Sequence, residues 1–425
     1  MSRLLIEGKQ VLSGEIRVSG NKNAVLPMIA ASLLTDEEIV LRNVPDIIDV
    51  KVMLSLAEHL GISVSFSENT LRLQASNIRD SKLPVEFCNK IRTSILFTGP
   101  LIHRCGNAQI WPPGGDVIGR RRLDGHFYGL KKLGVEILSD KPPYNFKAKK
   151  HISGKDLFLD EASVTATEHI MMFAALAKGR TIIRNAASEP HVRSLAELLI
   201  KMGANISGLD SNTLTIDGVE KLHGAEHTIE GDHIEAASFL AMAAATGGEI
   251  TIHGTLPRHY WMTRRVFERL GIKIRLNSDN IYMSAQQDLR IKPDLGNAIP
   301  VISDGPWPQF PSDMMSCMIV TATQTKGSVL FFEKMFESRI YFVDRLISMG
   351  ANAIVCDPHR AVISGPANLH GIEMSSPDIR AGMALVIAAL CAKGKSAINN
   401  ANMIFRGYDQ LVEKMSSLGG KISKG

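Results

Sequence analysis

The loop from Trp111 to His126, WPPGGDVIGRRRLDGH, holds the residue types best suited to chemistry. One carboxyl group, Asp116, stands between the glycine pair Gly114 and Gly115 and a run of three arginines. Paired glycines let a backbone approach a ligand closely, and forked arginine side chains bind carboxylate and phosphate groups. The loop therefore indicates an anionic ligand beside Asp116, although an Asx-turn in a flexible loop would use the same residues.

Charged residues also recur at one phase of the sequence, where a helix is expected to begin. They are Lys22 and Asn23, Arg92, Glu168, Asp232 and Glu235, Asp313, and Asp378 and Arg380. Acidic residues at such positions are commonly helix caps, and FPSD and SPD before two of the helices are good capping sequences. Capping does not explain the cations, because positive charge at a helix N-terminus opposes the helix dipole. We therefore expect bound anions beside Lys22, Arg92 and Arg380.

A second set of arginines lies just before or within the other helix of each repeat. It comprises Arg120, Arg121, Arg122, Arg339 and Arg406. A solvated surface is the usual place of an arginine, but GRRRLDG follows a glycine-rich loop and FRGYD contains a glycine of its own. Several anionic groups, carboxylate and phosphate, would use this many forked donors. ATP-driven and NAD-linked reactions are disfavoured, since the chain lacks both a Walker sequence and a dinucleotide fingerprint.

A repeat of about 70 residues must position these side chains. A Leu-Gly or Met-Gly followed by a strand-like run occurs six times, at Gly61, Gly134, Gly203, Gly271, Gly350 and Gly419, with spacings of 73, 69, 68, 79 and 69 residues. Upstream of each glycine lie a short strand and space for a helix that the glycine would terminate. Each repeat is predicted to run helix, strand, helix, strand, hairpin, strand, an alternation typical of an α/β fold.

The sixth repeat is incomplete at its C-terminal end, and the missing piece lies at the N-terminus. LLIEGKQVLSGEIRVSGNK aligns with two sister segments so that Gly8, Gly218 and Gly365 coincide. Residues 1–21 are therefore expected to complete the last repeat. Since six repeats exceed one hydrophobic core, we expect two domains of three repeats each. One spans residues 22–230 and carries the loop 111–126, and the other combines residues 1–21 with 231–425.

Composition excludes several classes of protein. The chain has 425 residues, 45% of them apolar and 21% charged, with 48 Lys and Arg against 43 Asp and Glu, a net charge of +5. This balance is typical of a globular protein and not of a disordered one. The most apolar stretch, residues 381–392, is too short to span a membrane, and no secretory signal is recognisable, so we expect a cytoplasmic protein. Aromatic residues make up only 6%, which argues against a nucleic-acid-binding surface.

Eight motifs in order resemble the UDP-N-acetylglucosamine 1-carboxyvinyltransferase family of enolpyruvyl transferases. They are SGNKNAVLP, NKIRTSILFTGPL, PPGGDVIGRRRLDGH, SVTATEHIMM, FPSDMMS, KMFESR, SPDIRAG and FRGYD, and they cover the whole chain. The resemblance implies a two-domain inside-out α/β barrel of six repeats with the substrates between the domains. It also implies transfer of the enolpyruvyl group of phosphoenolpyruvate to UDP-N-acetylglucosamine, the first committed step of peptidoglycan precursor synthesis, without metal or organic cofactor.

The resemblance also implies a role for individual residues. Asp116 would donate a proton to the phosphoenolpyruvate methylene, and Asp313 would be the base for the sugar 3-hydroxyl. Phosphoenolpyruvate would be held by Lys22, Asn23, Arg121 and Arg406. UDP-N-acetylglucosamine would be held by Arg92, Arg121, Arg122, Leu123, Asp124, Gly125, Glu161, Ala162, Ser163, Val164, Asp313 and Met335. Further polar cleft positions are Glu189, Asp232, Arg339, Asp378 and Arg380.

Two residues depart from the family pattern. Asp116 stands where many members have the cysteine that the epoxide fosfomycin alkylates, so we expect catalysis that is insensitive to fosfomycin. Glu161 stands where other members have lysine or another residue, and a carboxylate there cannot pair with diphosphate.

Other functions are left open by the sequence. Transfer to shikimate 3-phosphate or to another nucleotide, and an inactive nucleotide-sugar-binding paralogue, are the alternatives. The oligomeric state is not indicated.

Overall fold

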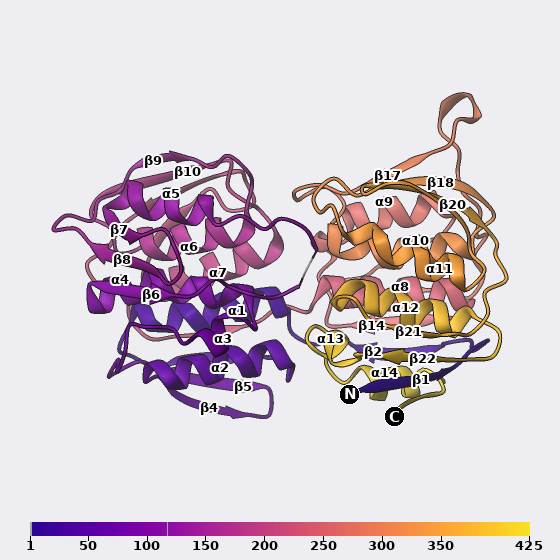
Figure 1. The fold of residues 1–425 in the computed structure, drawn as a ribbon, viewed down its shortest axis with the longest axis horizontal. Coiled ribbons are helices and arrows are strands. Elements are labelled where there is room, and N and C mark those ends of the chain that lie inside the picture. The colour runs from indigo at the N-terminus through magenta and orange to yellow at the C-terminus, as the bar shows by residue number, and fades with distance from the viewer. Residues whose placement is uncertain (1, 117) are drawn as a thin grey trace. The chain divides into compact units, whose positions relative to one another are not determined.

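The computed structural model describes residues 2–116 and 118–425. By their contacts these residues form two compact units. Unit 1 contains residues 2–19, 118–120 and 231–425, and unit 2 contains residues 20–116 and 121–230. Both ends of the chain lie in unit 1, close together (Figure 1).

Three helices in the interior of each unit are apolar on nearly every face. They are α1 (Lys22–Ala31), α4 (Thr98–Cys105) and α6 (Val164–Ala174) in unit 2, and α8 (His233–Thr246), α10 (Ser312–Thr323) and α12 (Ile379–Cys391) in unit 1. All 13 residues of α12 are buried. Because a helix that is apolar all round must be enclosed on every side, the sheets of each unit lie outside these helices (Figure 1). This arrangement inverts the usual α/β order.

A second helix in each repeat lies nearer the surface and ends at one of the predicted glycines. These helices are α2 (Ile48–Leu60), α5 (Asp124–Leu133), α7 (Pro190–Lys201), α9 (Trp261–Arg269), α11 (Val343–Ser348) and α14 (Leu411–Ser417). All six glycines have positive φ, between 79° at Gly271 and 109° at Gly134. Glycine adopts this left-handed conformation without strain, so the predicted helix ends are confirmed. Shorter helical turns are η1 (Ser32–Leu34), α3 (Val85–Cys88), η2 (Arg92–Phe97), η3 (Pro257–His259), η4 (Leu295–Asn297), η5 (Arg339–Phe342) and α13 (Asn402–Phe405).

The described residues contain six sheets, three in each unit. In strand order, the sheets of unit 2 are β13 (Ala225–Thr228), β3 (Ile39–Arg42), β5 (Thr70–Gln74) and β4 (Ser63–Ser67); β6 (Asn107–Ile110), β8 (Tyr144–Ala148) and β7 (Val135–Ser139); and β11 (Asn205–Ser207), β12 (Thr213–Asp217), β10 (Arg180–Arg184) and β9 (Asp156–Phe158). Those of unit 1 are β15 (Arg275–Leu276), β16 (Asn280–Met283), β14 (Ile250–His253) and β2 (Gly14–Arg17); β17 (Val301–Ser303), β18 (Gly327–Phe332), β20 (Arg360–Gly365) and β19 (Asn352–Asp357); and β21 (Glu373–Ser375), β22 (Lys395–Asn399), β1 (Arg3–Glu7) and β23 (Ile422–Lys424).

Neighbouring repeats of each unit are linked by short strands. Each of these strands follows the hairpin of one repeat and pairs in parallel with a strand of the next repeat. In unit 1, β2 pairs with β14, β17 with β18, and β21 with β22. In unit 2, β9 pairs with β10 and β13 with β3, while a single bridge from Lys82 to Gln109 takes the corresponding place in the three-stranded sheet. Three such links close a ring around the three interior helices.

The N-terminal strand fills the gap in the sixth repeat. β1 lies between β22 and β23 and is antiparallel to both, as β5 is to β3 and β4. Gly8, at the end of β1, approaches the last turn of an interior helix so closely that an added Cβ would overlap the Ala392 carbonyl oxygen. Gly218 approaches the Ala177 carbonyl oxygen in the same way. The aligned glycines therefore mark one contact that recurs between a strand end and a helix end.

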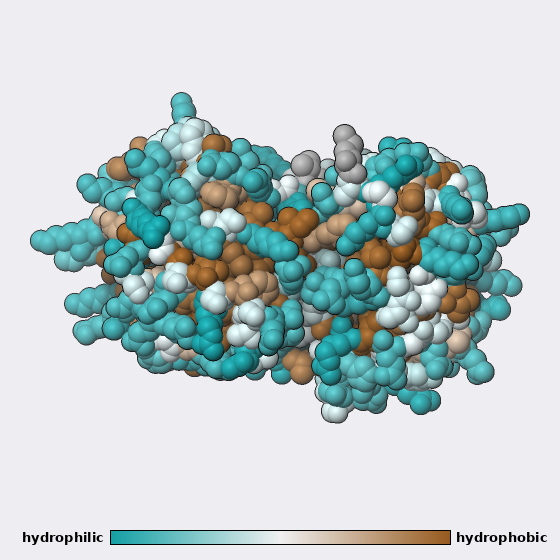
Figure 2. Space-filling model, turned by 90° about the horizontal axis from the view of Figure 1, so that it is seen from below, coloured by the Kyte–Doolittle hydropathy of each residue, from teal (hydrophilic) through white to brown (hydrophobic). Residues whose placement is uncertain are grey.

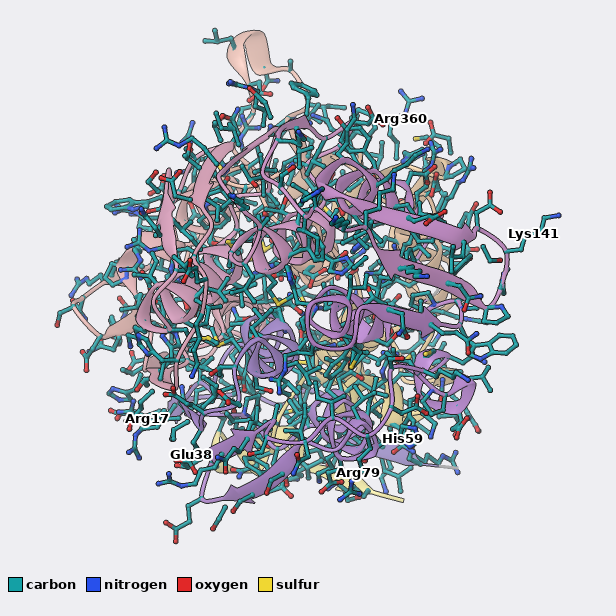
Figure 3. The ribbon with its side chains drawn as sticks, turned by 90° about the vertical axis from the view of Figure 1, so that its left-hand side faces the viewer. Arg17, Glu38, His59, Arg79, Lys141 and Arg360 are labelled. Atoms are coloured by element: carbon teal, nitrogen blue, oxygen red, sulfur yellow. The ribbon has the colours of Figure 1, made fainter. Side chains whose placement is uncertain are left out.

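The outer surface carries the charge. Glu38, Arg79 and Lys141 of unit 2 point outward from its periphery (Figure 3), and hydrophilic side chains cover much of the face in Figure 2. Within the described part of the chain, none of the helices combines the length and apolarity needed to cross a bilayer.

Replacing Gly218 by alanine tests the close approach of strand and helix ends. The added methyl group overlaps a backbone carbonyl that cannot rotate away, so we expect a loss of about 3 kcal/mol in the free energy of unfolding. Gly106→Ala is the control, since its methyl group meets open space and only the left-handed backbone opposes it, at about 1 kcal/mol. Urea unfolding measures both, and equal losses would contradict the steric account.

Candidate active site

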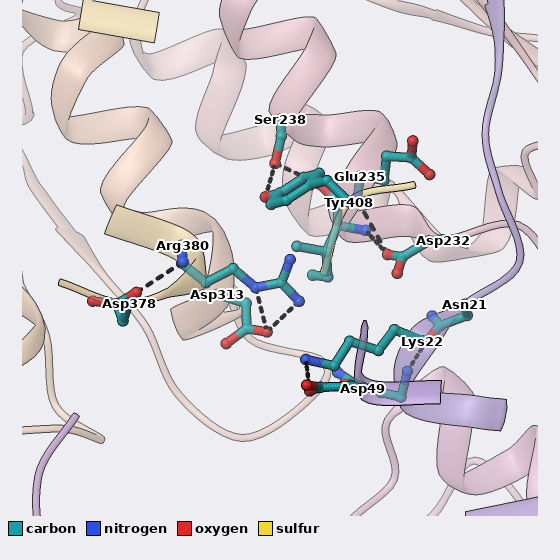
Figure 4. Close-up of polar contacts among 12 residues, drawn as sticks. Asn21, Lys22, Asp49, Asp232, Glu235, Ser238, Asp313, Asp378, Arg380 and Tyr408 are labelled. Carbon is teal, nitrogen blue, oxygen red and sulfur yellow. Dashed lines mark hydrogen bonds and ion pairs between the residues drawn. The ribbon is translucent and has the colours of Figure 1, made fainter. Parts of the chain in front are cut away.

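Lys22 begins interior helix α1 and is buried against a carboxylate. Its Nζ lies 2.7 Å from Asp49 Oδ2, and the two side chains are 9% and 4% exposed (Figure 4). Asn21 caps the same helix by accepting from the backbone N–H groups of Asn23 and Ala24. The positive charge at this helix start is therefore balanced by Asp49 from the first turn of α2, and the expectation of a bound anion there is not needed to explain it.

Arg92 holds the backbone of the loop 111–126. Its Nη1 and Nη2 donate to the carbonyl oxygens of Arg121 and Arg122 at 3.1 and 2.6 Å. Burial and the neighbouring charge of Arg121 lower the pKa of Arg92 to about 10, and its buried Nε has no hydrogen-bond partner. Two carbonyl dipoles therefore face the guanidinium from within the protein, and a bound anion beside it stays a prediction.

The segment after the arginines carries its own ion pair. Arg122 donates to both carboxylate oxygens of Asp124 at 2.9 and 3.0 Å, and both side chains are exposed. Glu161 is also exposed; its charge opposes the lowering of the Arg92 pKa and adds to the rise of the Arg122 pKa that the Asp124 hydrogen bond causes. The negative charge of Glu161 therefore partly offsets the positive charge of the nearby arginines.

The loop 111–126 is divided between the two units by its contacts. Asp116 is half-buried and belongs to unit 2, where an added Cβ on Gly115 would lie 3.4 Å from the Arg92 Cβ. Residues 118–120 belong to unit 1: Ile118 accepts from the Ser338 N–H at 3.3 Å, and the Glu337 carboxylate accepts from the Arg120 N–H at 3.2 Å.

Two buried histidines connect the end of this loop to α6. His126 Nδ1 lies 3.0 Å from His169 Nδ1, and His126 Nε2 lies 3.1 Å from Thr165 Oγ1. His169 Nε2 accepts from the Gly99 N–H at 2.9 Å, so its proton must be on Nδ1 and the His126 proton on Nε2. A proton added to His126 Nδ1 would break the bond between the rings, and one added to His169 Nε2 would break the bond from the Gly99 N–H. Burial lowers the pKa of both histidines, that of His169 to about 3.

Helix α6 begins where the resemblance places the sugar nucleotide. Ser163 caps the helix, and Ala162, Ser163 and Val164 are half-buried. One turn further along, Glu168 is 1% exposed and its Oε1 has no partner. Burial and the charge of Glu189, at the start of α7, raise the pKa of Glu168 well above its usual value.

In unit 1, one carboxylate joins two arginines from different repeats. Arg339 Nη2 donates to Asp313 Oδ1 at 2.7 Å, and Arg380 Nε and Nη2 lie 2.9 and 2.8 Å from Asp313 Oδ2 (Figure 4). Burial alone would raise the pKa of Asp313, but the two guanidinium groups outweigh it and hold that pKa far below its usual range. Asp313 is therefore ionised and only weakly basic.

The same arginines retain unused donors. Among the described residues, Nε and Nη1 of Arg339 and Nη1 of Arg380 are buried and have no hydrogen-bond partner. The two residues are 7% and 4% exposed. Because a buried guanidinium N–H left unpaired is costly, these three donors favour an anionic or carbonyl ligand beside Asp313.

Helix capping explains two of the predicted acids and not the third. Asp232 accepts from the N–H groups of Ile234 and Glu235, and Asp378 accepts from those of Arg380 and Ala381. Asp313 lies inside the first turn of α10, whose N-cap is Pro311. The capping interpretation of FPSD is therefore wrong, because the Asp313 carboxylate turns to two arginines.

The remaining expected site residues lie at the surface of unit 1 or near it. Met335 is 38% exposed, and Arg406 is half-buried at the end of α13. Two residues beyond Arg406, the buried Tyr408 bonds Ser238 at 2.9 Å and lies under the Arg380 guanidinium, 5.5 Å from ring centre to Cζ.

Comparison with known proteins places this geometry in a family. A family model described as EPSP synthase (3-phosphoshikimate 1-carboxyvinyltransferase) matches residues 6–415. UDP-N-acetylglucosamine 1-carboxyvinyltransferase of Treponema denticola is 52% identical over 423 residues, 99% of either chain, and that of Borreliella burgdorferi is 50% identical over 424 residues, 100% of this chain and 99% of the relative. The chain belongs to the UDP-N-acetylglucosamine 1-carboxyvinyltransferase branch of the EPSP synthase family.

Solved structures of this family share the fold. The enolpyruvyl transferase NikO from Streptomyces tendae superposes with a TM-score of 0.87 at 21% identity, over 100% of this chain and 99% of that one. EPSP synthase from Acinetobacter baumannii gives 0.77 at 16% identity over the full length of both chains. The predicted family and the predicted inside-out α/β fold are confirmed.

Sequence reasoning missed several residues that support the enolpyruvyl transferase site. They are Asp49 beside Lys22, the pair His126 and His169, Tyr408 beneath Arg380, and Lys414, whose Nζ contacts Ser19 Oγ at 2.7 Å and the buried Glu235 at 2.5 Å. Most of them lie outside the helix starts at which charge recurs.

The buried histidine pair predicts acid sensitivity. Above pH 6.5 both rings are neutral in the folded and in the unfolded chain. Below pH 6.5 the rings take up protons in the unfolded chain only, because burial lowers their pKa in the folded protein. The free energy of unfolding therefore falls as pH decreases. We expect a slope approaching 1.4 kcal/mol per pH unit for each histidine. Urea unfolding between pH 7.5 and 5.5 measures it. His169→Asn reduces the slope, whereas His223→Gln, which removes an exposed ring, is the control; an unchanged slope in His169→Asn contradicts the assignment.

Proposed function

We propose that this protein transfers the enolpyruvyl group of phosphoenolpyruvate to the 3-hydroxyl of UDP-N-acetylglucosamine and releases phosphate, opening peptidoglycan precursor synthesis. The observation that carries the proposal is the identity of about 50% over the full chain with relatives of that name. The two units would be the two domains, divided near residues 21 and 230, with the substrates bound by residues of both.

The addition step begins with protonation of phosphoenolpyruvate. Asp116 donates to the methylene carbon of phosphoenolpyruvate, which creates a cationic centre at the adjacent carbon. The sugar 3-oxygen attacks that centre, forms the new C–O bond and loses its proton to Asp313. A carboxylate that two arginines have made weakly basic suits this order, because the hydroxyl proton becomes strongly acidic only once the oxygen bonds to the cation.

Elimination then restores the double bond. The C–O bond to phosphate breaks, the phosphate leaves with its electron pair, and the methyl group returns a proton to the Asp116 carboxylate. Lys22, Asn23, Arg121 and Arg406 would hold the phosphate and carboxylate throughout.

The sugar nucleotide would lie along the starts of α5 and α6. Arg92 would act through the loop backbone that it holds, at residues 121 and 122, rather than by direct ion pairing. Leu123, Asp124 and Gly125 would face the nucleotide from α5, with Met335 and the free donors of Arg339 and Arg380 contributed by unit 1. Glu161 would contact uracil or ribose and not the diphosphate.

Phosphate release from phosphoenolpyruvate tests the reaction. We expect release with UDP-N-acetylglucosamine and none with shikimate 3-phosphate. Asp116→Asn should lower kcat by about 10²–10⁴-fold, as expected for loss of a general acid. Release with shikimate 3-phosphate alone would support the alternative acceptor, and release with neither would support an inactive nucleotide-sugar-binding protein.

Reaction with fosfomycin distinguishes a carboxylate from a thiolate at position 116. A carboxylate attacks the epoxide far more slowly than a thiolate, so the wild-type protein should keep its intact mass and activity after incubation. Asp116→Cys, the matched variant, should gain one covalent adduct by mass spectrometry and lose activity in parallel. A stable adduct on wild-type Asp116 would overturn this proposal without affecting the acceptor assignment.

A further inference from the structure

Two buried carboxyl groups meet at the ends of neighbouring parallel strands in unit 1. β17 and β18 pair in parallel with Ser303 opposite Phe332, so the next residues, Asp304 and Glu333, are neighbours in register. Both are 0% exposed, and their carboxyl groups lie within hydrogen-bonding reach of each other. Two ionised carboxylates at this distance in a buried site repel strongly, whereas one shared proton turns the repulsion into a hydrogen bond.

The hydrogen bonds around the pair favour a proton between Glu333 Oε2, which also lies 2.9 Å from the Ser312 hydroxyl, and Asp304 Oδ2. Glu333 Oε1 accepts from the Ser312 hydroxyl at 2.7 Å and from the Phe336 N–H at 3.2 Å, and Asp304 Oδ1 accepts from the Lys334 N–H at 2.5 Å. The buried Asp304 Oδ2 has no donor in the described part of the chain. A proton carried by Glu333 Oε2 would supply it.

Sister repeats show that the fold itself does not require acids here. At the position of Glu333, three other repeats have an asparagine with positive φ: Asn43, Asn185 and Asn400. Each of these side chains donates to the carbonyl oxygen of the adjoining strand, at 2.8, 2.8 and 3.1 Å. The fifth repeat alone among these replaces that neutral contact with a pair of acids, at the repeat that carries Asp313.

The pair is connected to two parts of the proposed site. Ser312 precedes Asp313 on the first turn of α10. The Lys334 and Phe336 N–H groups flank Met335, and the same segment leads to Arg339, which holds Asp313. The acids therefore fix both the carboxylate and the segment opposite it.

We propose that Glu333 and Asp304 share one proton and that the pair is a positioning device for the sugar-nucleotide half of the site. Glu333 is a positioning residue that acts through Ser312 and the 334–336 backbone. This inference rests on the proposed function for its substrate but not for the shared proton.

The surroundings place the loss of that proton in the alkaline range. Burial raises the pKa of Glu333 to about 9, the hydrogen bond and charge of Asp304 add to the rise, and the Arg339 charge opposes it. The His359 ring contacts only the Glu333 backbone carbonyl, through Nδ1 at 2.7 Å. Positioning is therefore complete at neutral pH and is lost as pH rises through about 9.

Glu333→Gln tests the inference, because an amide keeps a donor toward Asp304 Oδ2 and an acceptor toward Ser312 but cannot ionise. In wild-type protein the KM for UDP-N-acetylglucosamine should rise about tenfold between pH 7.5 and 9.5, while in Glu333→Gln it stays within about twofold of its neutral value. Glu373→Gln, an exposed glutamate on β21, is the control and should follow the wild type. A Glu333→Gln variant that has lost sugar-nucleotide affinity at every pH would overturn the proposal, since an ionised carboxylate would then be required.

Infrared difference spectroscopy of the full chain gives a readout that needs no turnover. In the difference spectrum between the wild-type protein and Glu333→Gln, a protonated-carboxyl C=O band should be present at pH 7.5 and disappear on titration to pH 10; the band of the buried Glu168, whose pKa burial also raises, is common to both proteins and cancels. Absence of that band in the wild type excludes the shared proton even if the transferase assignment holds. If the band is present but no acceptor is converted, the shared proton is supported and the proposed function is rejected.

Discussion

Interior helices that are buried on nearly every side determine the rest of this structure. Five of them, α1, α6, α8, α10 and α12, have almost no face in contact with water, so sheets must enclose them, and the sheets are joined into a ring. Only the ends of such helices can carry polar groups without burying them unpaired. The charged groups at the starts of these helices, Lys22, Asp313 and Arg380 among them, therefore have polar partners within the protein.

The buried cations of the candidate site have partners within the protein even without a ligand. Lys22 has Asp49, Arg92 has two carbonyl oxygens, and Arg380 has Asp313. An isolated buried charge would shift the stability of each unit by several kcal/mol, so these partners are what allow cations to remain in the interior of the fold. The buried donors that have no partner among the described residues include those of Arg339 and Arg380.

The repeat made much of the architecture predictable from sequence. Helix ends followed from six glycines, and the family followed from eight ordered motifs, because both signals depend on local spacing. The parallel strands that join the sheets were not foreseen. Strands of three or four residues, such as β17 and β21, are too short for their alternation to be recognised.

Side-chain pairing was the least predictable feature of the site. Asp49, His169 and Asp304 are ordinary residues by position, and their importance comes from tertiary neighbours far away in the sequence. The capping sequence FPSD illustrates the limit, because its aspartate satisfies a local rule and yet two distant arginines take its carboxylate.

The place of β1 between β22 and β23 has a consequence for synthesis. On a ribosome, every strand and helix of unit 2 has been made once residue 230 is reached, with about 195 residues still to come. At roughly 5–20 residues per second, that leaves on the order of 10–40 s in which unit 2 can fold by itself. Throughout that interval β1 has neither of its neighbouring strands to pair with, because β22 and β23 are among the last strands to be synthesised. The first strand to be made is thus one of the last to be paired, and an emerging chain must keep an unpaired strand edge from aggregating until its own C-terminus arrives.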